Sequence, residues 1–424
     1  MDSWLFYKRS IFKNSIEWVL LEILIPREVN KTPQAMEQFF MNLHGLRNAA
    51  GNFLEKYIDG EVTMWWSLEL ASFGGEVHFY IKTPKKHKKM VEAGLYAQYP
   101  NVEIIEVKDY MDEFPRDTRE IYRNDFNVFG GEFILKKEDA YPITTYEKFE
   151  LTKEELAIDP ISALVEVLSN IHKEEKVFIQ ILIRPAGDEW QKEGKKLVDK
   201  LLGRKEKTSS PSGVSGLMEW FRNLLWAPVA HPTWAGKGEE KNGAKEENQN
   251  ILAKLTPGER DTIKVVEESL SKPGFESLIR FIYYAPKSIF STNFARRGIL
   301  GALNQYASPQ LNSFGGNPFV ETRSRWIYFP YLFVPQRVEA RKQRILYNYR
   351  NRKLPEESSW AKLSTSHPLN FNFKSKTYIL NTTEVATIFH VPAEQVLTAP
   401  HVKRSESKKM GPPAGLPIFD EGSE

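Results

Sequence analysis

The chain of 424 residues contains no cysteine. Disulfide bridges, cysteine-ligated zinc and cysteine nucleophiles are therefore excluded together. No apolar run approaches the ~18–20 residues that a membrane-spanning helix needs. The best stretch, residues 18–26, is far shorter and contains Glu22. No signal peptide is visible at the N-terminus either. We therefore expect a cytoplasmic protein.

The sequence also lacks the motifs of the common catalytic sites. No GxxxxGK[ST] run exists to cradle a phosphate, and no GxSxG run exists to present a nucleophilic serine. The eight histidines never stand at the short spacings that bind metal ions. We expect a protein that is not an enzyme and that has no catalytic residues, no cofactor and no metal.

A large excess of charge of either sign is missing as well. The net charge is +3, so a protein that coats DNA through its whole surface is excluded, and any contact with nucleic acid must come from a local patch. Apolar residues make up 41% of the chain and aromatic residues 12%. This composition supports well-packed cores in an α+β protein.

Hydrophobic patterning indicates a first domain over residues 1–112. Two glycines, Gly74 and Gly75, mark a hairpin turn between two strands. The helix after Thr32 has a good N-cap residue and a proline at its first position. The predicted elements are a strand (16–25), a helix (33–46), two strands (63–72 and 76–83), a helix (87–99) and a strand (102–107). This β-α-β-β-α-β order predicts a ferredoxin-like domain.

A second domain of similar order is predicted over residues 128–320, after a charged linker at 109–127. Its strands are expected at 131–136, 176–184 and 275–285, with helices between them and a loop at 314–318. An insertion at 203–255 has low-complexity flanks that predict flexibility. We thus expect two ferredoxin-like domains in tandem, then a basic helical and extended region at 321–400 and a disordered tail at 401–424.

The centre of the insertion is dense in tryptophan and leucine. An amphipathic helix there would contact a membrane interface or a groove in a partner, and it could equally fold back on its own domain. The candidate anchor residues are Trp220, Phe221, Leu224, Leu225 and Trp226.

A basic helix with interleaved tyrosines is predicted over residues 337–353. Basic and aromatic side chains together suit phosphate contact and base stacking, but a solvated helix beside an acidic partner or an anionic lipid has the same composition. The candidate nucleic-acid-binding residues are Arg337, Arg341, Lys342, Arg344, Tyr347, Arg350 and Arg352.

One family resemblance covers most of residues 16–417. The runs LNTTEVATIFHVP and TAPHVKRSESKKMGPPAGLP, together with WWSLELASFGGEVHFYIKTP and STNFARRGILGALNQY upstream, resemble the N-terminal region of bacterial type IV secretion and conjugation ATPases. That region has no established function and precedes the DNA-translocating motor domain. The motor domain is absent from this sequence, so the resemblance does not imply ATPase activity.

The resemblance implies a scaffold or docking component that pairs with a separately encoded motor ATPase. Asn381 or Thr382 is expected to cap a short helix, whose apolar residues Val385, Ile388 and Phe389 are the candidate partner-docking side chains. A position at the cytoplasmic face of the inner membrane, a membrane-surface contact and an oligomer are left open. The alternative function is binding of single-stranded nucleic acid by the basic helix, with DNA as the open candidate.

Overall fold

A computed structural model describes residues 2–26, 29, 31–150, 159–202, 256–322, 331–356 and 358–393. The candidate anchor at Trp220–Trp226 and the predicted tail at 401–424 therefore lie outside the described residues. Most of the aromatic run at 326–334 lies outside them as well. Within the described residues, no helix is both long enough and apolar enough to cross a bilayer.

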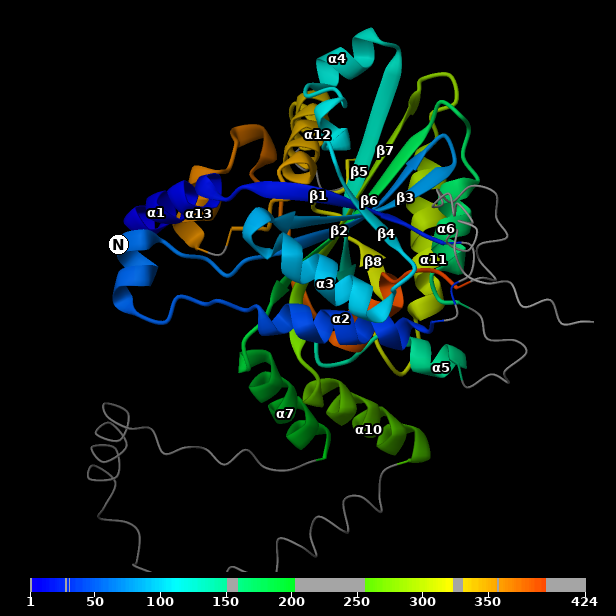
Figure 1. The fold of residues 1–424 in the computed structure, drawn as a ribbon. Coiled ribbons are helices and arrows are strands. Elements are labelled where there is room, and N and C mark those ends of the chain that lie inside the picture. The colour runs from blue at the N-terminus through cyan, green and yellow to red at the C-terminus, as the bar shows by residue number, and fades with distance from the viewer. Residues whose placement is uncertain are drawn as a thin grey trace, which may run out of the picture.

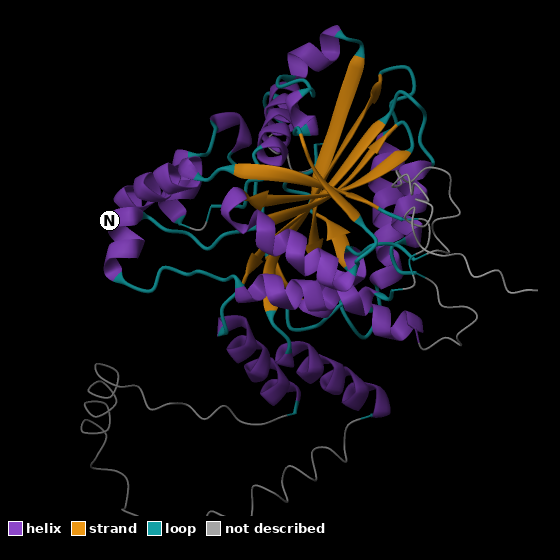
Figure 2. Cartoon of the chain, viewed as in Figure 1, coloured by secondary structure: helices purple, strands orange, loops and turns teal. Residues whose placement is uncertain are grey.

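One large sheet forms the centre of the molecule, with helices on both of its faces (Figures 1 and 2). All of its strand pairs are antiparallel. The nine strands are β1 (Trp18–Leu24), β2 (Trp66–Phe73), β3 (Glu76–Pro84), β4 (Glu103–Val107), β5 (Phe126–Leu135), β6 (Lys176–Pro185), β7 (Gly274–Pro286), β8 (Phe314–Gly316) and β9 (Tyr378–Asn381). The α+β class expected from the sequence is confirmed.

The strand order is β4-β1-β3-β2-β6-β7-β5-β8, and β9 pairs with β7 beside this path. The order is nearly a mirror image about the pair β2–β6, where Leu68 lies opposite Ile181. We number the four strands of each half in chain order, β1 to β4 in one half and β5 to β8 in the other. From the seam outward, both halves then show the order second, third, first and fourth. The two segments of the chain therefore join edge to edge into one continuous sheet.

One face of the sheet carries the main hydrophobic core. Its helices are α2 (Pro33–Gly45), α3 (Lys88–Gln98), α6 (Ser162–Ser169), α11 (Ile299–Leu303) and α14 (Thr382–Ile388). The strands alternate apolar residues toward these helices, for example Leu68 and Leu70 of β2. The N-cap residue Thr32 precedes α2 as predicted, but its side chain makes no capping hydrogen bond. The buried residues of α3 are Val91 and Leu95, whereas Met90 is exposed.

The opposite face is covered by α12 (Val334–Arg350) and by α4 (Thr118–Arg123) with the turn η3 (Tyr110–Asp112). The stretch at 109–127 was predicted as a charged linker. Instead, Met111, Phe114 and Ile121 are buried against this face of the sheet, because the sheet offers apolar surface here that the charged neighbours do not fill.

Two further helices, α7 (Glu189–Leu201) and α10 (Pro257–Ser271), pack against each other at one end of the sheet. A capping box formed by Thr256 and Glu259 begins α10. The predicted loop at 314–318 contains strand β8, which pairs with the end of β5. The sequence did not predict this strand, because it contains Gly315 and Gly316 and glycine is unfavourable inside strands.

The N-terminal helix α1 (Asp2–Ser15) lies outside the sheet, against the π-helical turn η1 (Glu55–Asp59) and α13 (Ser359–Ser364) (Figure 1). Gly60 has a φ of +70°, and a Cβ there would lie 2.5 Å from the carbonyl carbon of Lys8. Only glycine fits both this left-handed conformation and this close approach.

The C-terminal end of the described chain is part of the core. Asn381 caps α14, and Glu384 completes the capping box. The three residues predicted to dock a partner, Val385, Ile388 and Phe389, are each at most 1% exposed. The prediction that they dock a partner is therefore wrong, because their apolar side chains fill the space between α14, α2 and the sheet.

The remaining short elements are α5 (Tyr146–Glu150), η2 (Lys85–His87), η4 (Phe294–Gly298), η5 (Asn304–Tyr306) and η7 (Pro368–Asn370).

Candidate functional site

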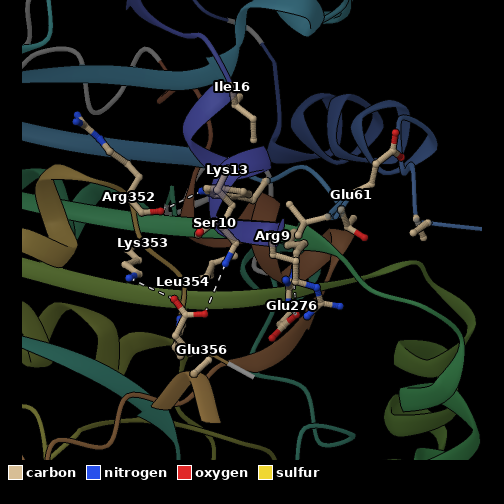
Figure 3. Close-up of a pocket in the computed structure, with 18 of the residues that line it drawn as sticks. Arg9, Ser10, Lys13, Ile16, Glu61, Glu276, Arg352, Lys353, Leu354 and Glu356 are labelled. Atoms are coloured by element: carbon tan, nitrogen blue, oxygen red, sulfur yellow. Dashed lines mark hydrogen bonds and ion pairs between the residues drawn. The ribbon is translucent and has the colours of Figure 1, made fainter. Parts of the chain in front are cut away.

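A cavity of about 900 Å³ lies between α1, the loop before β2 and the segment that follows α12 (Figure 3). The rings of Trp18 and Trp65 form an apolar part of the cavity wall, and their centroids are 4.9 Å apart. Cationic side chains outnumber carboxylates in the lining. The cations are Arg9, Lys13, Arg47, Lys56, Lys82, Arg184, Arg350, Arg352 and Lys353, and the carboxylates are Asp2, Glu61, Glu189, Glu276 and Glu356.

Some of these charges are paired within the cavity wall. Glu356 lies 3.2 Å from the ammonium of Lys353 and 3.7 Å from that of Lys13, which links α1 to the segment after α12 (Figure 3). Arg47 and Lys56 are exposed and form no ion pair among the described residues. These two cations are available to an anionic group in the cavity.

Behind the cavity lies a buried ion network. Arg352 is 2% exposed and binds the carboxylate of Glu69 in a bidentate manner, with Nε–Oε1 at 2.8 Å and Nη2–Oε2 at 3.0 Å. It also binds Asp109, with Nη1–Oδ2 at 2.6 Å, and Lys82 donates to the same carboxylate. Every charge in this network therefore has an opposite charge in direct contact.

The pKa directions of this network follow from burial and charge pairing. Burial opposes ionisation of Glu69, but the guanidinium of Arg352 outweighs it, so the pKa of Glu69 is lowered. The pKa of Asp109 is lowered by the same balance, since Arg352 and Lys82 overcome its burial. Burial opposes the charge of Arg352 too, and Glu69 and Asp109 raise its pKa well above the ordinary value. Glu69, Asp109 and Arg352 are therefore ionised together.

The network belongs to a line of polar side chains that crosses the sheet. Cross-strand neighbours in antiparallel strands point to the same face. Six such neighbours, one from each central strand, form what we name the polar row: Glu22, Tyr80, Glu69, Gln180, Arg280 and Glu132.

Hydrogen bonds connect four members of the polar row. Gln180 donates to Glu69 over 3.1 Å, and Arg280 donates to Gln180 over 3.0 Å and to Glu132 over 2.9 Å. The C-terminal end of α12 supplies further acceptors, since Arg280 also donates to the carbonyl of Asn348. Helix α12 is thereby docked on the polar row by its C-terminal carbonyls.

The structure divides the predicted nucleic-acid-binding residues into two groups. Tyr347, Arg350 and Arg352 line the cavity. Tyr347 is exposed, Arg350 donates to the carbonyl of Phe114, and Arg352 belongs to the buried network. Helix α12 brings these three residues to one end of the molecule, together with Arg47 and Lys56, which sequence reasoning missed.

The other four predicted residues lie nearer the N-terminal end of α12 and make contacts within the chain. Arg337 and Arg341 are buried, with Arg337 over the ring of Phe371. Lys342 donates to Tyr122 and Asn127, and Arg344 donates to the carbonyl of Thr365. Burial lowers the pKa of both Lys342 and Arg344. The basic helix is therefore largely a packing helix.

The sequence contains a pattern that indicates the buried network. Several central strands place an ionisable or amide residue in the middle of an apolar run, such as Glu69 in SLELAS and Arg280 in SLIRFI. A charge in the middle of a buried strand needs a partner, since an unpaired buried charge is strongly unfavourable. The pattern indicates that such residues meet, although it does not say which pairs form.

A second buried ion pair holds the end of the described chain. His390 Nε2 lies 2.7 Å from Asp159 Oδ1, and the amide of Ala393 donates to Asp159 Oδ2 over 2.7 Å. The other ring nitrogen, Nδ1, lies 2.8 Å from the carbonyl of Ala386. Asp159 is buried, yet the contact with His390 lowers its pKa. We name this set of contacts the Asp159 clamp.

The arrangement is suited to binding rather than to a known metal chemistry. Among the described residues, no three histidine, aspartate or glutamate side chains are grouped so that they could hold a metal ion. The cavity combines unpaired cations with aromatic wall, and its floor is a fixed, fully paired ion network. Together these features describe a sheet protein with a cavity whose lining is rich in cations.

The chain belongs to the family described as "Domain of unknown function (DUF8128)", whose pattern matches residues 8–404. No curated protein matches the sequence.

Proposed function

We propose that this chain is a non-enzymatic scaffold of a type IV secretion or conjugation-like system, and that it docks beside a separately encoded motor ATPase. The resemblance of residues 378–417 to the segment before the motor domain of those ATPases supports the choice of partner. In this proposal the segment after Ala393 docks the motor, and the buried side chains of α14 do not.

The Asp159 clamp is the observation that carries this proposal. Strand β9 is paired to β7, α14 is buried, and Asp159 holds both His390 and the amide of Ala393. The described chain therefore ends at a fixed point, Ala393, to which residue 394 is joined. A fixed point of departure is what a linker needs in order to place a partner at a defined position.

Deletion of residues 394–424 tests the proposal by affinity purification from cells that also express a P-loop motor encoded beside this gene. We expect the motor to co-purify with the full chain and to be lost with the deletion. A variant in which 394–424 is scrambled at constant composition controls for charge alone. Retention of the motor by the deletion variant contradicts the proposal. A deletion from residue 382 is unsuitable, because it also removes α14 from the core.

We also propose that the two halves of the sheet are two ferredoxin-like units in tandem. Each half has the strand order fourth, first, third, second, which is the order of that fold. The polar row repeats in the same way, because Glu22 and Glu132 lie on the first strand of each half, and Glu69 and Gln180 lie on the second. Duplication of one unit accounts for this correspondence.

The second candidate function is binding of single-stranded nucleic acid in the cationic cavity. Arg47, Lys56 and the exposed ring of Tyr347 favour it, since they offer cations for phosphates and a surface on which a base could stack. Replacement of Arg341 would be a poor test, because this buried residue also holds Asn372.

Fluorescence anisotropy with a labelled oligothymidylate tests this second function at low and high salt. The triple variant Arg47→Ala, Lys56→Ala, Tyr347→Ala should weaken binding by about tenfold or more. The matched control is Lys195→Ala, Lys264→Ala, Tyr96→Ala, which removes the same charges and one exposed ring elsewhere. Absence of binding at low salt, or equal loss in both variants, excludes the cavity as the site.

A further inference from the structure

Large apolar side chains gather on the outer surface of α1 and η1. Trp4, Tyr7 and Ile11 lie on one face of α1 at helical spacing, and each is about half exposed. Phe53, Leu54 and Ile58 lie on or beside η1 and are similarly exposed. We name these six residues the aromatic patch. No residue of α1 is buried, so this helix is not part of the hydrophobic core.

The neighbouring helix α13 extends the same surface. It contacts α1, and its Trp360 and Leu363 are also about half exposed or more. Figure 1 shows α1, η1 and α13 projecting together at the N-terminal side of the molecule. Clusters of exposed apolar side chains on this scale mark interaction surfaces, whereas single exposed residues do not.

The aromatic patch is held in place by the chain itself. The indole of Trp4 donates to the carbonyl of Tyr57 over 2.8 Å, which joins α1 to η1. Gly60 allows the backbone to approach Lys8 more closely than any side chain would permit. The exposed rings are therefore presented in a defined arrangement before any partner binds.

Lysines lie beside the aromatic side chains of the patch. Lys8 lies over the ring of Trp4 and Lys56 over the ring of Tyr57, and Lys362 is exposed on α13. The acids nearby are Asp2, Glu55 and Asp59. Of these, Glu55 already accepts from the amide of Gly51 and from Asn52. Tryptophan and tyrosine beside lysine are the side chains of the membrane–water interface.

We propose that the aromatic patch docks this protein on the surface of an anionic lipid bilayer. Helix α1 has 14 residues. At ~1.5 Å per residue its length is roughly 21 Å, which is too short to cross the hydrocarbon core. The helix lies in the plane of the interface, with its rings among the acyl chains and its lysines at the headgroups. This surface is separate from the docking segment after Ala393, and it shares Lys56 with the rim of the cationic cavity.

Vesicle flotation of the full chain tests the proposal. The vesicles are phosphatidylcholine alone, or phosphatidylcholine with about one third phosphatidylglycerol, the anionic component that the lysines would recognise. We expect binding to the anionic vesicles, reduced about tenfold or more by Trp4→Ala, Tyr7→Ala, Ile11→Ala, because each side chain loses its burial in the interface. Replacement of Lys8, Lys56 and Lys362 by glutamate should weaken binding most strongly at low salt.

The matched control is Met41→Ala, Met90→Ala, Tyr96→Ala, which removes three similarly exposed side chains from α2 and α3. It should bind vesicles as the unmodified chain does, and all variants should keep the same thermal midpoint. Absence of vesicle binding, or equal loss in the control, overturns the proposal. So does binding that is abolished only by deletion of 217–226. So does a Trp4, Tyr7 and Ile11 triple variant that loses motor co-purification and keeps vesicle binding.

Discussion

At the residue scale, the charges buried on the sheet depend on their partners. A charge placed in a buried strand is tolerated only when its partner is in contact, and Arg352 is the partner for both Glu69 and Asp109. The guanidinium also fixes the end of α12 on the sheet. Removal of this one side chain leaves Glu69 buried without an opposite charge, while Asp109 keeps only Lys82.

Arg352→Ala should therefore lower the free energy of unfolding by about 3–5 kcal/mol. Urea unfolding followed by circular dichroism measures this change. Lys85→Ala is the control, since the ion pair of Lys85 with Glu17 is fully exposed and its loss should leave stability nearly unchanged. Similar destabilisation by both variants would show that burial of the pair is not the cause.

Glu384 makes stability depend on pH. Burial raises the pKa of this carboxyl from 4.5 to about 8. Between these pH values the folded state keeps a proton that the unfolded state has released. The free energy of unfolding therefore falls as pH rises from about 4.5 to about 8, and this contribution levels off above pH 8.

The variant Glu384→Gln cannot ionise and should lack this dependence. At pH 5 it should be less stable than the unmodified chain by about 1–2 kcal/mol, because one capping acceptor is lost. At pH 8.5 the difference should be smaller or reversed. Parallel urea curves at both pH values measure it, and a deficit that stays constant with pH contradicts the raised pKa.

At the element scale, the sequence predicted most strands and helices within a few residues, because their apolar periodicity is strong. The prediction failed for residues and elements whose position depends on tertiary contacts. Helix α12 was predicted as a basic surface, yet Arg341 is buried because Asn372 and a carbonyl satisfy it. Strand β8 and the packing of Met111 also depend on distant partners that local patterns do not encode.

The elements β9 and α14 are expected to be essential for folding. A chain that ends after Thr377 lacks Leu380 and Val385, both fully buried, and should lose its cooperative thermal transition. A chain that ends after Ala393 keeps the Asp159 clamp and should unfold at the same temperature as the full chain. Equal midpoints for the two truncations would contradict the assignment of α14 to the core.

At the scale of the whole molecule, the cavity could not be predicted from the sequence. Its walls come from α1, the loop before β2 and the segment after α12, which lie about 300 residues apart in the chain. The sequence did indicate two similar halves, but the patterning gave no sign that β2 and β6 pair into one sheet. Edge-to-edge pairing depends on backbone groups that every residue shares.

The fragment 1–112 should therefore self-associate. Without β6, strand β2 becomes an open edge with apolar neighbours such as Leu68 and Leu70. Size-exclusion chromatography with light scattering should show dimers or larger species, and co-expression of the fragment with 113–424 should restore a one-to-one complex. A stable monomeric fragment contradicts the role of the β2–β6 seam.

The Asp159 clamp also determines how the molecule carries mechanical tension. A pull on residue 394 reaches the amide of Ala393 and the ring of His390 before it reaches β9. Asp159 passes the load to the amide of Ile161 and so to α6, which packs on β2 and β3 in the middle of the sheet. Tension is thereby spread over the central strands, instead of peeling β9 away from the end of β7.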